Sequence, residues 1–134
     1  MYKRIMVAVD GSEIAQQALA EAINIANTYN AALCIVHCIG SENEVDKNRG
    51  NEILEKAKSD TNVLSVETRL LNAEAEYGLN GIADAIAAAV YDWKADLIVV
   101  GTSNRRGLER FYVGSVAEQL IAKVDSSILL VRSK

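Results

Sequence analysis

Residues 97–117 read LIVVGTSNRRGLERFYVGSVA, and this stretch decides the fold class. It begins with four apolar residues, too few for a helix, which indicate a buried strand. A segment framed by Gly101 and Gly114 follows, and from Ser115 onward the apolar residues recur with helical spacing. A strand that leads through such a loop into a helix is typical of an α/β protein with a parallel sheet.

The same alternation extends over the whole chain. Runs rich in Val, Ile and Leu predict five strands, at 5–9, 33–39, 63–71, 97–100 and 128–131. The segments between them have helical spacing, whereas 40–51 and 72–81 have the polar and glycine content of loops. We therefore predict one α/β domain over residues 1–134, an open five-stranded parallel sheet with helices on both faces.

The third and the last of these runs differ from the others. Leu64 and Val66 alternate with polar residues, as expected of a half-exposed edge strand. The last run is apolar on both faces, although terminal strands often form an edge that needs protection; it consists of Ile128, Leu129, Leu130 and Val131. A homodimer that seals this edge is one solution, and a helix that covers it within the monomer is the other.

Composition and missing motifs exclude several classes of function. The net charge of −4 and the lack of a basic stripe argue against nucleic-acid binding. No apolar run approaches the roughly 18 residues of a membrane-spanning helix, and the first residues lack a secretory signal pattern, so we expect a cytoplasmic protein with no membrane partner. The phosphate loop of NTPases, the dinucleotide-binding glycine motif and the nucleophile elbow of serine hydrolases are all missing.

The two cysteines, Cys34 and Cys38, fall four residues apart in one predicted strand. At about 3.3 Å per residue they lie on one face about 13 Å apart, too far for a disulfide. His37 stands between them and points to the opposite face, so the three residues do not form a set of metal ligands. We interpret them as strand residues that fill space beside the core.

Polar residues follow the predicted strands at the edge where ligands bind in such sheets, outside the carboxyl ends of the strands. Asp10 either caps the next helix or accepts hydrogen bonds from a ligand's ribose or base. Ser115 and Glu118 form a Ser-x-x-Glu capping pattern, with the alternative that free amides at this helix start bind phosphate. Arg105, Arg106 and Arg110 either pair with phosphates or belong to a solvated loop.

Four segments together resemble the universal stress protein family over nearly the whole chain. They are 5–12, 36–38, 95–101 and 114–118, which read IMVAVDGS, VHC, ADLIVVG and GSVAE. ATP-binding members carry Gly-x2-Gly-x9-Gly-Ser/Thr, and here Gly101, Gly114 and Ser115 occupy the first, third and final places. Asn104 occupies the second. Asparagine tolerates a left-handed backbone, but its side chain crowds a ribose or phosphate that packs against bare backbone.

The resemblance implies a Rossmann-like fold of the adenine nucleotide α-hydrolase type, strand order 3-2-1-4-5 and a homodimer through the last strand. It also implies ATP as ligand, with Mg²⁺ or Mn²⁺ bridging phosphate oxygens. Adenine and ribose would contact Ala8, Val9, Asp10, Cys38, Val100 and Gly101. The remaining implied nucleotide-binding residues are Asn104 and Arg105, together with Gly114, Ser115 and Val116 at the phosphates.

The resemblance therefore implies a stress-response module that binds ATP. Hydrolysis is expected to be slow at most, because no obvious base or water-positioning group is present. Two alternatives stay open. One is a member that has lost ATP and acts through its dimer and partner surfaces, and the other is an enzyme that uses Asp10 with a metal.

Overall fold

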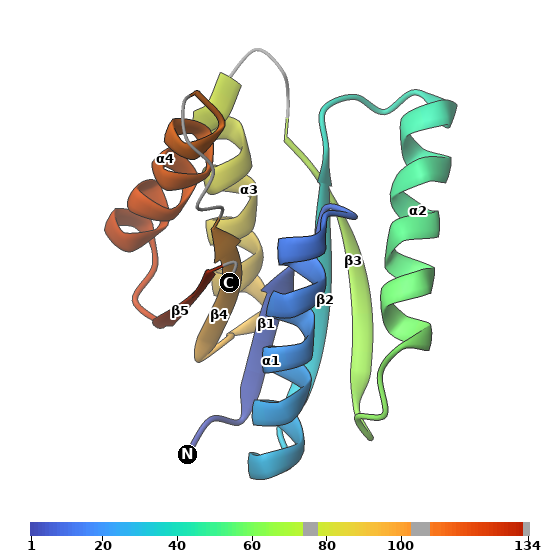
Figure 1. Cartoon of the computed structure of the whole chain (residues 1–134), viewed down its shortest axis with the longest axis vertical. Helices are drawn as coiled ribbons and strands as arrows, with labels where there is room; N and C mark the ends of the chain where they lie inside the picture. The colour runs from blue at the N-terminus through green and yellow to red at the C-terminus, as the bar shows by residue number, and fades with distance from the viewer. Residues whose placement is uncertain (74–77, 103–107, 133–134) are drawn as a thin grey trace.

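The central strands are apolar on both faces, so helices must cover the sheet from both sides. The computed structural model describes the backbone of residues 1–73, 78–102 and 108–132, and their side chains except those of 78–80 and 108–115. Figure 1 shows the resulting strands and helices, which alternate along the chain. They are β1 Arg4–Ala8, α1 Glu13–Tyr29, β2 Ala32–Ile39, α2 Glu44–Ser59, β3 Val66–Asn72, α3 Gly78–Trp93, β4 Leu97–Thr102, α4 Leu108–Lys123 and β5 Ser127–Arg132.

The strands form one parallel sheet in the order β3-β2-β1-β4-β5. From β1 the chain builds outward through β2 to β3, then returns to the other side of β1 for β4 and β5. Ala8 at the end of β1 lies opposite Val36 of β2, and Val7 lies opposite Val99 of β4. The predicted fold class and strand order are confirmed, and β3 is an edge strand as predicted.

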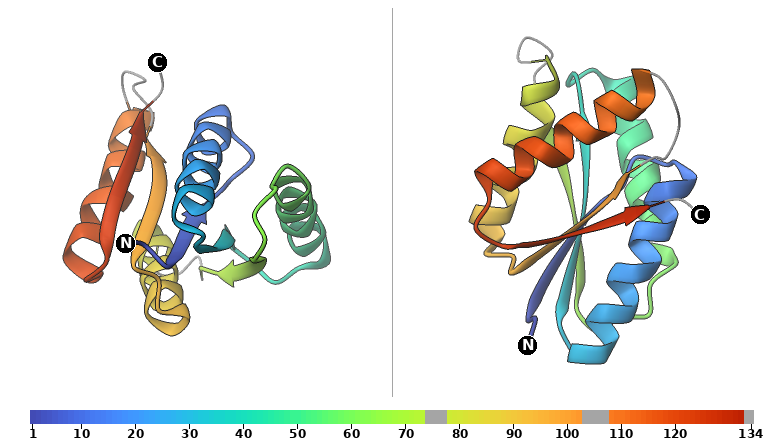
Figure 2. Two further views of the ribbon diagram at one scale, coloured as in Figure 1. Left: turned by 90° about the horizontal axis from the view of Figure 1, so that it is seen from below. Right: turned by 60° about the vertical axis from the view of Figure 1, so that its left-hand side comes forward.

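Alternate residues of each strand pack against different pairs of helices. Ile5 and Val7 belong to the core under α1 and α2, whereas Met6 belongs to the core under α3 and α4. All three are fully buried. Figure 2 shows the two helix layers on either side of the sheet. Because both faces are covered, a ligand can reach the central strands only at their ends.

Helix α2 replaces most of the loop predicted at 40–51. It begins at Glu44, and the side chain of Asn43 caps it by accepting a hydrogen bond from the Asp46 amide at 2.8 Å. Acidic residues in the first turn and lysines in the last complement the helix dipole. The loop prediction was wrong because this helix is mostly polar and contains Gly50, whose role depends on contacts with β2 and β3.

Three other predicted boundaries were wrong. Helix α3 begins at Gly78, inside the loop predicted at 72–81. Helix α4 begins at Leu108 rather than at Ser115, since residues 108–113 include good helix formers and no proline, and these offset the roughly 1 kcal/mol cost of Gly114 inside a helix. Leu64 precedes β3 and is fully exposed, because the chain bends at 64–65 before the strand begins.

A polar cluster ties β1 to β4 at the end of the sheet where the strands begin. The Asp96 carboxylate accepts hydrogen bonds from the backbone amides of Lys3 at 2.8 Å and Arg4 at 3.2 Å. Arg4 donates through Nε to the Trp93 carbonyl at 2.8 Å, and its guanidinium lies 4.0 Å from the centre of the Trp93 ring. This cluster holds the two central strands in register and leaves their other ends to form a site.

Candidate functional site

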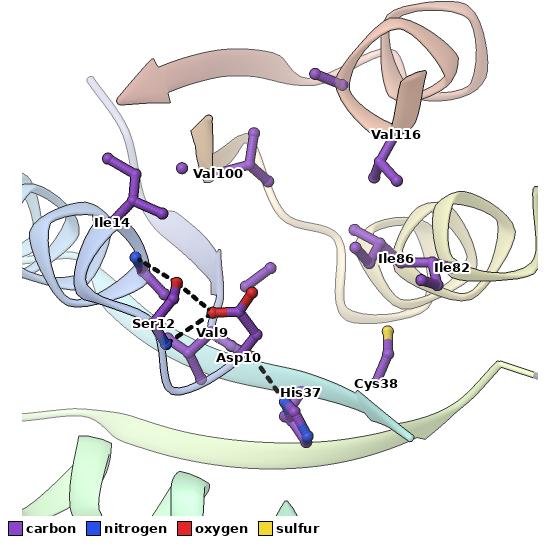
Figure 3. Close-up of a pocket in the computed structure, with 14 residues that line it drawn as sticks. Val9, Asp10, Ser12, Ile14, His37, Cys38, Ile82, Ile86, Val100 and Val116 are labelled. Carbon is purple, nitrogen blue, oxygen red and sulfur yellow. Dashed lines mark hydrogen bonds between the residues drawn. The ribbon is translucent and has the colours of Figure 1, made fainter. Parts of the chain in front are cut away.

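A cavity of about 290 Å³ opens at the carboxyl ends of β1, β2 and β4. It lies where the strand order reverses between β1 and β4, the usual ligand position in open α/β sheets. Figure 3 shows Asp10 and Ser12 on one side and Ile82, Ile86 and Val116 across from them. The lining residues are Ala8, Val9, Asp10, Ser12, Ile14, Ala15, His37, Cys38, Ile82, Ile86, Val100, Gly101, Val116 and Ala117.

Most of the residues predicted for nucleotide binding converge on this cavity. They are Ala8, Val9, Asp10, Cys38, Val100, Gly101 and Val116. Asn104 and Arg105 lie outside the described residues. Gly114 and Ser115 lie within α4, where the side chain of Ser115 is not described. The sequence interpretation missed the other lining residues: Ser12, Ile14, Ala15, His37, Ile82, Ile86 and Ala117.

Asp10 sits in a tight turn that joins β1 to α1. Its Oδ1 accepts hydrogen bonds from the Ser12 amide at 3.0 Å and the Ser12 hydroxyl at 2.5 Å. The Ser12 Oγ in turn accepts from the Ala15 amide at 3.3 Å, so Ser12 is the N-cap of α1. The interpretation of Asp10 as the helix cap was therefore wrong. Gly11 has φ +85°, a left-handed conformation that glycine adopts without steric cost.

The same hydrogen bonds orient the Asp10 carboxylate. With Oδ1 held by Ser12, the second oxygen points into the cavity in Figure 3. Asp10 is the acidic member of the described lining, which includes no lysine or arginine. A carboxylate in this position accepts hydrogen bonds and attracts hydroxyl, amino or cationic groups.

His37 and Cys38 form the wall of the cavity at the end of β2. The Nδ1 atom of His37 lies 2.7 Å from the Val9 carbonyl oxygen. Because a carbonyl only accepts hydrogen bonds, this contact is a hydrogen bond only when Nδ1 carries a proton. Cys34 and Cys38 pack toward the core under α3 and α4, while His37 faces α2 next to Gly50, which confirms their predicted placement on opposite faces.

Both cysteines are free thiols. Burial raises the pKa of Cys38 to about 11. Burial, with a smaller contribution from the charge of Glu67, raises the pKa of Cys34 to about 12. The thiols are therefore neutral at neutral pH, and Cys38 offers the cavity a polarizable, weakly polar surface.

Gly101 allows the first turn of α1 to approach β4 closely. A Cβ atom at this position would lie 2.9 Å from Cγ1 and 3.0 Å from the carbonyl oxygen of Ile14. Real Cβ atoms essentially never make a contact as short as 2.9 Å, and 3.0 Å from a backbone oxygen is unusually tight, so a larger residue would require Ile14 and the first turn of α1 to shift by a few tenths of an ångström. The glycine thus places Ile14 and Ser12 at the rim of the cavity.

The opposite wall is apolar and comes from the other helix layer. Ile82 and Ile86 of α3, Val100 of β4 and Val116 of α4 all face the cavity. Opposite a carboxylate and a hydroxyl, such a wall suits a flat ring that carries hydrogen-bonding groups along one edge.

The model of the universal stress protein family matches residues 1–132. The chain belongs to the universal stress protein family. A universal stress protein of Methanocaldococcus jannaschii is 31% identical, with 98% of this chain and 83% of the relative aligned. A putative universal stress protein of Staphylococcus saprophyticus is 34% identical, with 99% of this chain and 85% of the relative aligned.

Solved universal stress proteins share the fold. A structure from Archaeoglobus fulgidus, in complex with dAMP, has a TM-score of 0.74 and 26% identity, covering 97% of this chain and 98% of that chain. Another universal stress protein, in complex with cAMP, has a TM-score of 0.78 and 23% identity, with 99% of each chain covered. At 23% identity the second match supports the fold alone.

The cavity of this universal stress protein also bears on the metal that the family resemblance implies. Among the described residues, no three His, Cys, Asp or Glu side chains gather closely enough to hold an ion by themselves. Mg²⁺ that is held mainly by phosphate oxygens and water needs only one or two protein carboxylates, and Asp10 offers one. The described residues therefore fit an ion that arrives with a nucleotide. Within the same residues, no helix combines the length and hydropathy needed to cross a membrane.

Proposed function

We propose that this universal stress protein binds an adenine nucleotide, ATP in particular, in the cavity at the ends of β1, β2 and β4. The observation that carries the proposal is the pairing of a ligand-facing Asp10 carboxylate with the apolar wall of Ile82 and Ile86. The base would lie against the wall and Cys38, and the ribose hydroxyls would donate to Asp10. The relative from Archaeoglobus fulgidus, in complex with dAMP, supports this ligand class.

The phosphates are assigned to the connection between β4 and α4. Because α4 begins at Leu108, the amides of residues 114–116 lie within a helix, where backbone groups bond to one another. The amides without helical partners are those of the first turn of α4. Mg²⁺ or Mn²⁺ bound to the phosphates would neutralise their charge next to Asp10, and Asp10 would hold the nucleotide through its ribose.

Calorimetric titration with ATP tests the proposal. Asp10→Asn keeps the shape of the turn but removes the charge, so ATP affinity should fall about tenfold to a hundredfold, as hydrogen bonds to a charged group imply. Glu13→Gln removes the same charge from the first turn of α1, outside the cavity lining, and should leave affinity nearly unchanged. Absence of binding at millimolar ATP, with no nucleotide co-purifying, would refute the proposal.

We also propose that two copies pair through β5, which forms one of the two edges of the sheet. Leu130 of β5 is 39% exposed and Ile121 of α4 is 61% exposed, so pairing would remove apolar surface from water. Leu130→Lys should convert the dimer to a monomer in sedimentation velocity. Leu64→Lys at the far edge is the matched control, because Leu64 is fully exposed. A wild-type protein that sediments as a monomer contradicts the pairing.

The exposed β5 edge supports one alternative function. In it, the protein does not bind ATP and acts by binding partner proteins through its surface. Asn104→Gly separates the two functions, although residue 104 lies outside the described residues. If the wild type binds ATP, the nucleotide function stands. If only Asn104→Gly binds, the cavity has lost its ligand and the interaction function is favoured.

A further inference from the structure

The chain's single histidine lies beneath the turn that presents Asp10 to the cavity. The geometry points to His37 as a positioning residue for the ligand: its Nδ1–H holds the Val9 carbonyl and thereby sets the direction of the Asp10 carboxylate. The inference rests on the proposed nucleotide site for its effect on binding. Its structural part, the tautomer and the turn, can be measured without any ligand.

Val9 is attached to β2 through both of its backbone polar groups. Its amide donates to the Val36 carbonyl at 2.9 Å, and its carbonyl accepts from His37 Nδ1 at 2.7 Å. The first bond extends the pairing of β1 with β2, whereas the second comes from a side chain and depends on its identity. Because both backbone polar groups of Val9 are hydrogen-bonded, the position of Val9 is fixed at the start of the turn through Asp10 and Gly11.

Helix α2 restrains the imidazole from behind. A Cβ atom at Gly50 would lie 3.2 Å from His37 Cδ2 and 2.7 Å from Leu70 Cδ1, so the helix backbone already lies close to the ring. Ile53 lies one turn further along α2, near the turn between β1 and α1. A Cβ atom added at Gly11 would lie 3.6 Å from Cδ1 of Ile53. Helix α2 therefore passes close to the histidine ring, with Ile53 near the turn, and the space into which the ring could move away from the Val9 carbonyl is limited.

This geometry requires a donor at one particular atom. Asparagine carries an amide nitrogen on Cγ, the place that Nδ1 occupies in histidine, whereas glutamine carries it one bond further out. His37→Asn should therefore keep ATP affinity within about threefold of the wild type, because a buried carbonyl keeps its partner. His37→Gln and His37→Leu leave that carbonyl without a donor and should weaken ATP binding by about tenfold or more.

The experiment combines a spectrum with a titration. Nitrogen-15 spectra of the single imidazole, recorded at pH 8.5, where imidazole is ordinarily neutral, should show the Nδ1–H tautomer in the free protein. The amide signals of Gly11 and Ser12 should shift in His37→Leu and His37→Gln but stay near the wild type in His37→Asn. Calorimetry with ATP on the same variants then measures the consequence for binding.

The outcomes separate the two claims. An Nε2–H tautomer, or His37→Leu and His37→Gln that bind ATP like the wild type, overturns the positioning role. If the wild type binds no nucleotide, the proposed function fails, and the tautomer and the turn amides still decide whether His37 positions Asp10. If His37→Leu does not fold, His37→Asn and His37→Gln give the same test. Both new side chains are polar amides, and they differ only in how far the amide nitrogen lies from the backbone.

Discussion

A methyl group added at Gly101 should separate α1 from β4 and close part of the cavity. The Cβ of Gly101→Ala would lie 2.9 Å from Cγ1 and 3.0 Å from the carbonyl oxygen of Ile14. Cγ1 is bonded directly to Cβ of a β-branched helix residue and so has little freedom to turn away, and the carbonyl belongs to the first turn of α1. Relief therefore requires the helix to shift by a few tenths of an ångström.

The expected cost follows from overpacking in a well-packed interior, which is typically about 1–3 kcal/mol. Replacing glycine by alanine also lowers the conformational entropy of the unfolded chain, which raises the free energy of unfolding by about 0.4–1 kcal/mol. With central values of about 2 and 0.7 kcal/mol for these two effects, the net loss in the free energy of unfolding is about 1–2 kcal/mol. With a urea dependence of about 2 kcal/mol per molar, the middle of the usual range, the unfolding midpoint should fall by about 0.5–1 M.

Urea unfolding followed by tryptophan fluorescence measures this change. Trp93 is the only tryptophan, is 4% exposed and lies against Arg4, so its emission reports global unfolding. Gly40→Ala is the matched control, because no described atom lies within 4 Å of a Cβ at that position. The double variant Ile14→Ala, Gly101→Ala should recover only part of the lost free energy of unfolding, because the Ile14 carbonyl stays in place. A midpoint for Gly101→Ala equal to those of the wild type and Gly40→Ala would refute the reasoning.

Three further predictions follow from single contacts. Ser12→Ala removes the cap that accepts from the Ala15 amide, so the free energy of unfolding should fall by about 1 kcal/mol in the same urea assay. Lys94 has φ +62°, so Lys94→Gly should raise the free energy of unfolding by about 1 kcal/mol, and any loss would contradict the strain argument. At pH 8 Cys38 should react with iodoacetamide about a hundredfold more slowly than a free thiol, because its pKa is raised from 9.0 to about 11. Its rate should rise about tenfold per pH unit up to that pKa, and a rate equal to that of a free thiol would show an exposed cysteine.

The strands could be predicted because burial on both faces makes their sequences apolar throughout. The first and last residues of the helices were harder to predict from the sequence, and α2 shows why. Gly50 has the appearance of a loop residue, yet it is buried where a side chain would collide with Leu70 and His37. The reason for that glycine lies on β2 and β3 and has no local signature. The capping residue Asn43 and the acidic first turn were the available signals for the helix start.

The site was predictable to the extent that it depends on strand ends. Asp10, Cys38 and Gly101 follow or end strands that are neighbours in a parallel sheet, so topology alone brings them together. The apolar wall was missed because the spacing of Ile82 and Ile86 is the same whether they face a core or a cavity. The bond from His37 to Val9 was missed because it depends on the register between β1 and β2.

Gly101 illustrates how a motif glycine can have two roles that a sequence does not separate. In the family motif it leaves room for a ligand, whereas in this structure the space beside it is taken by the Ile14 carbonyl. The two roles predict different couplings between stability and binding. A substitution at Gly101 should lower both, because it moves α1 and with it the cavity rim at Ser12. A substitution at Asp10 that keeps the turn should lower ATP affinity alone, so comparing the two variants distinguishes a residue that shapes the site from one that contacts the ligand.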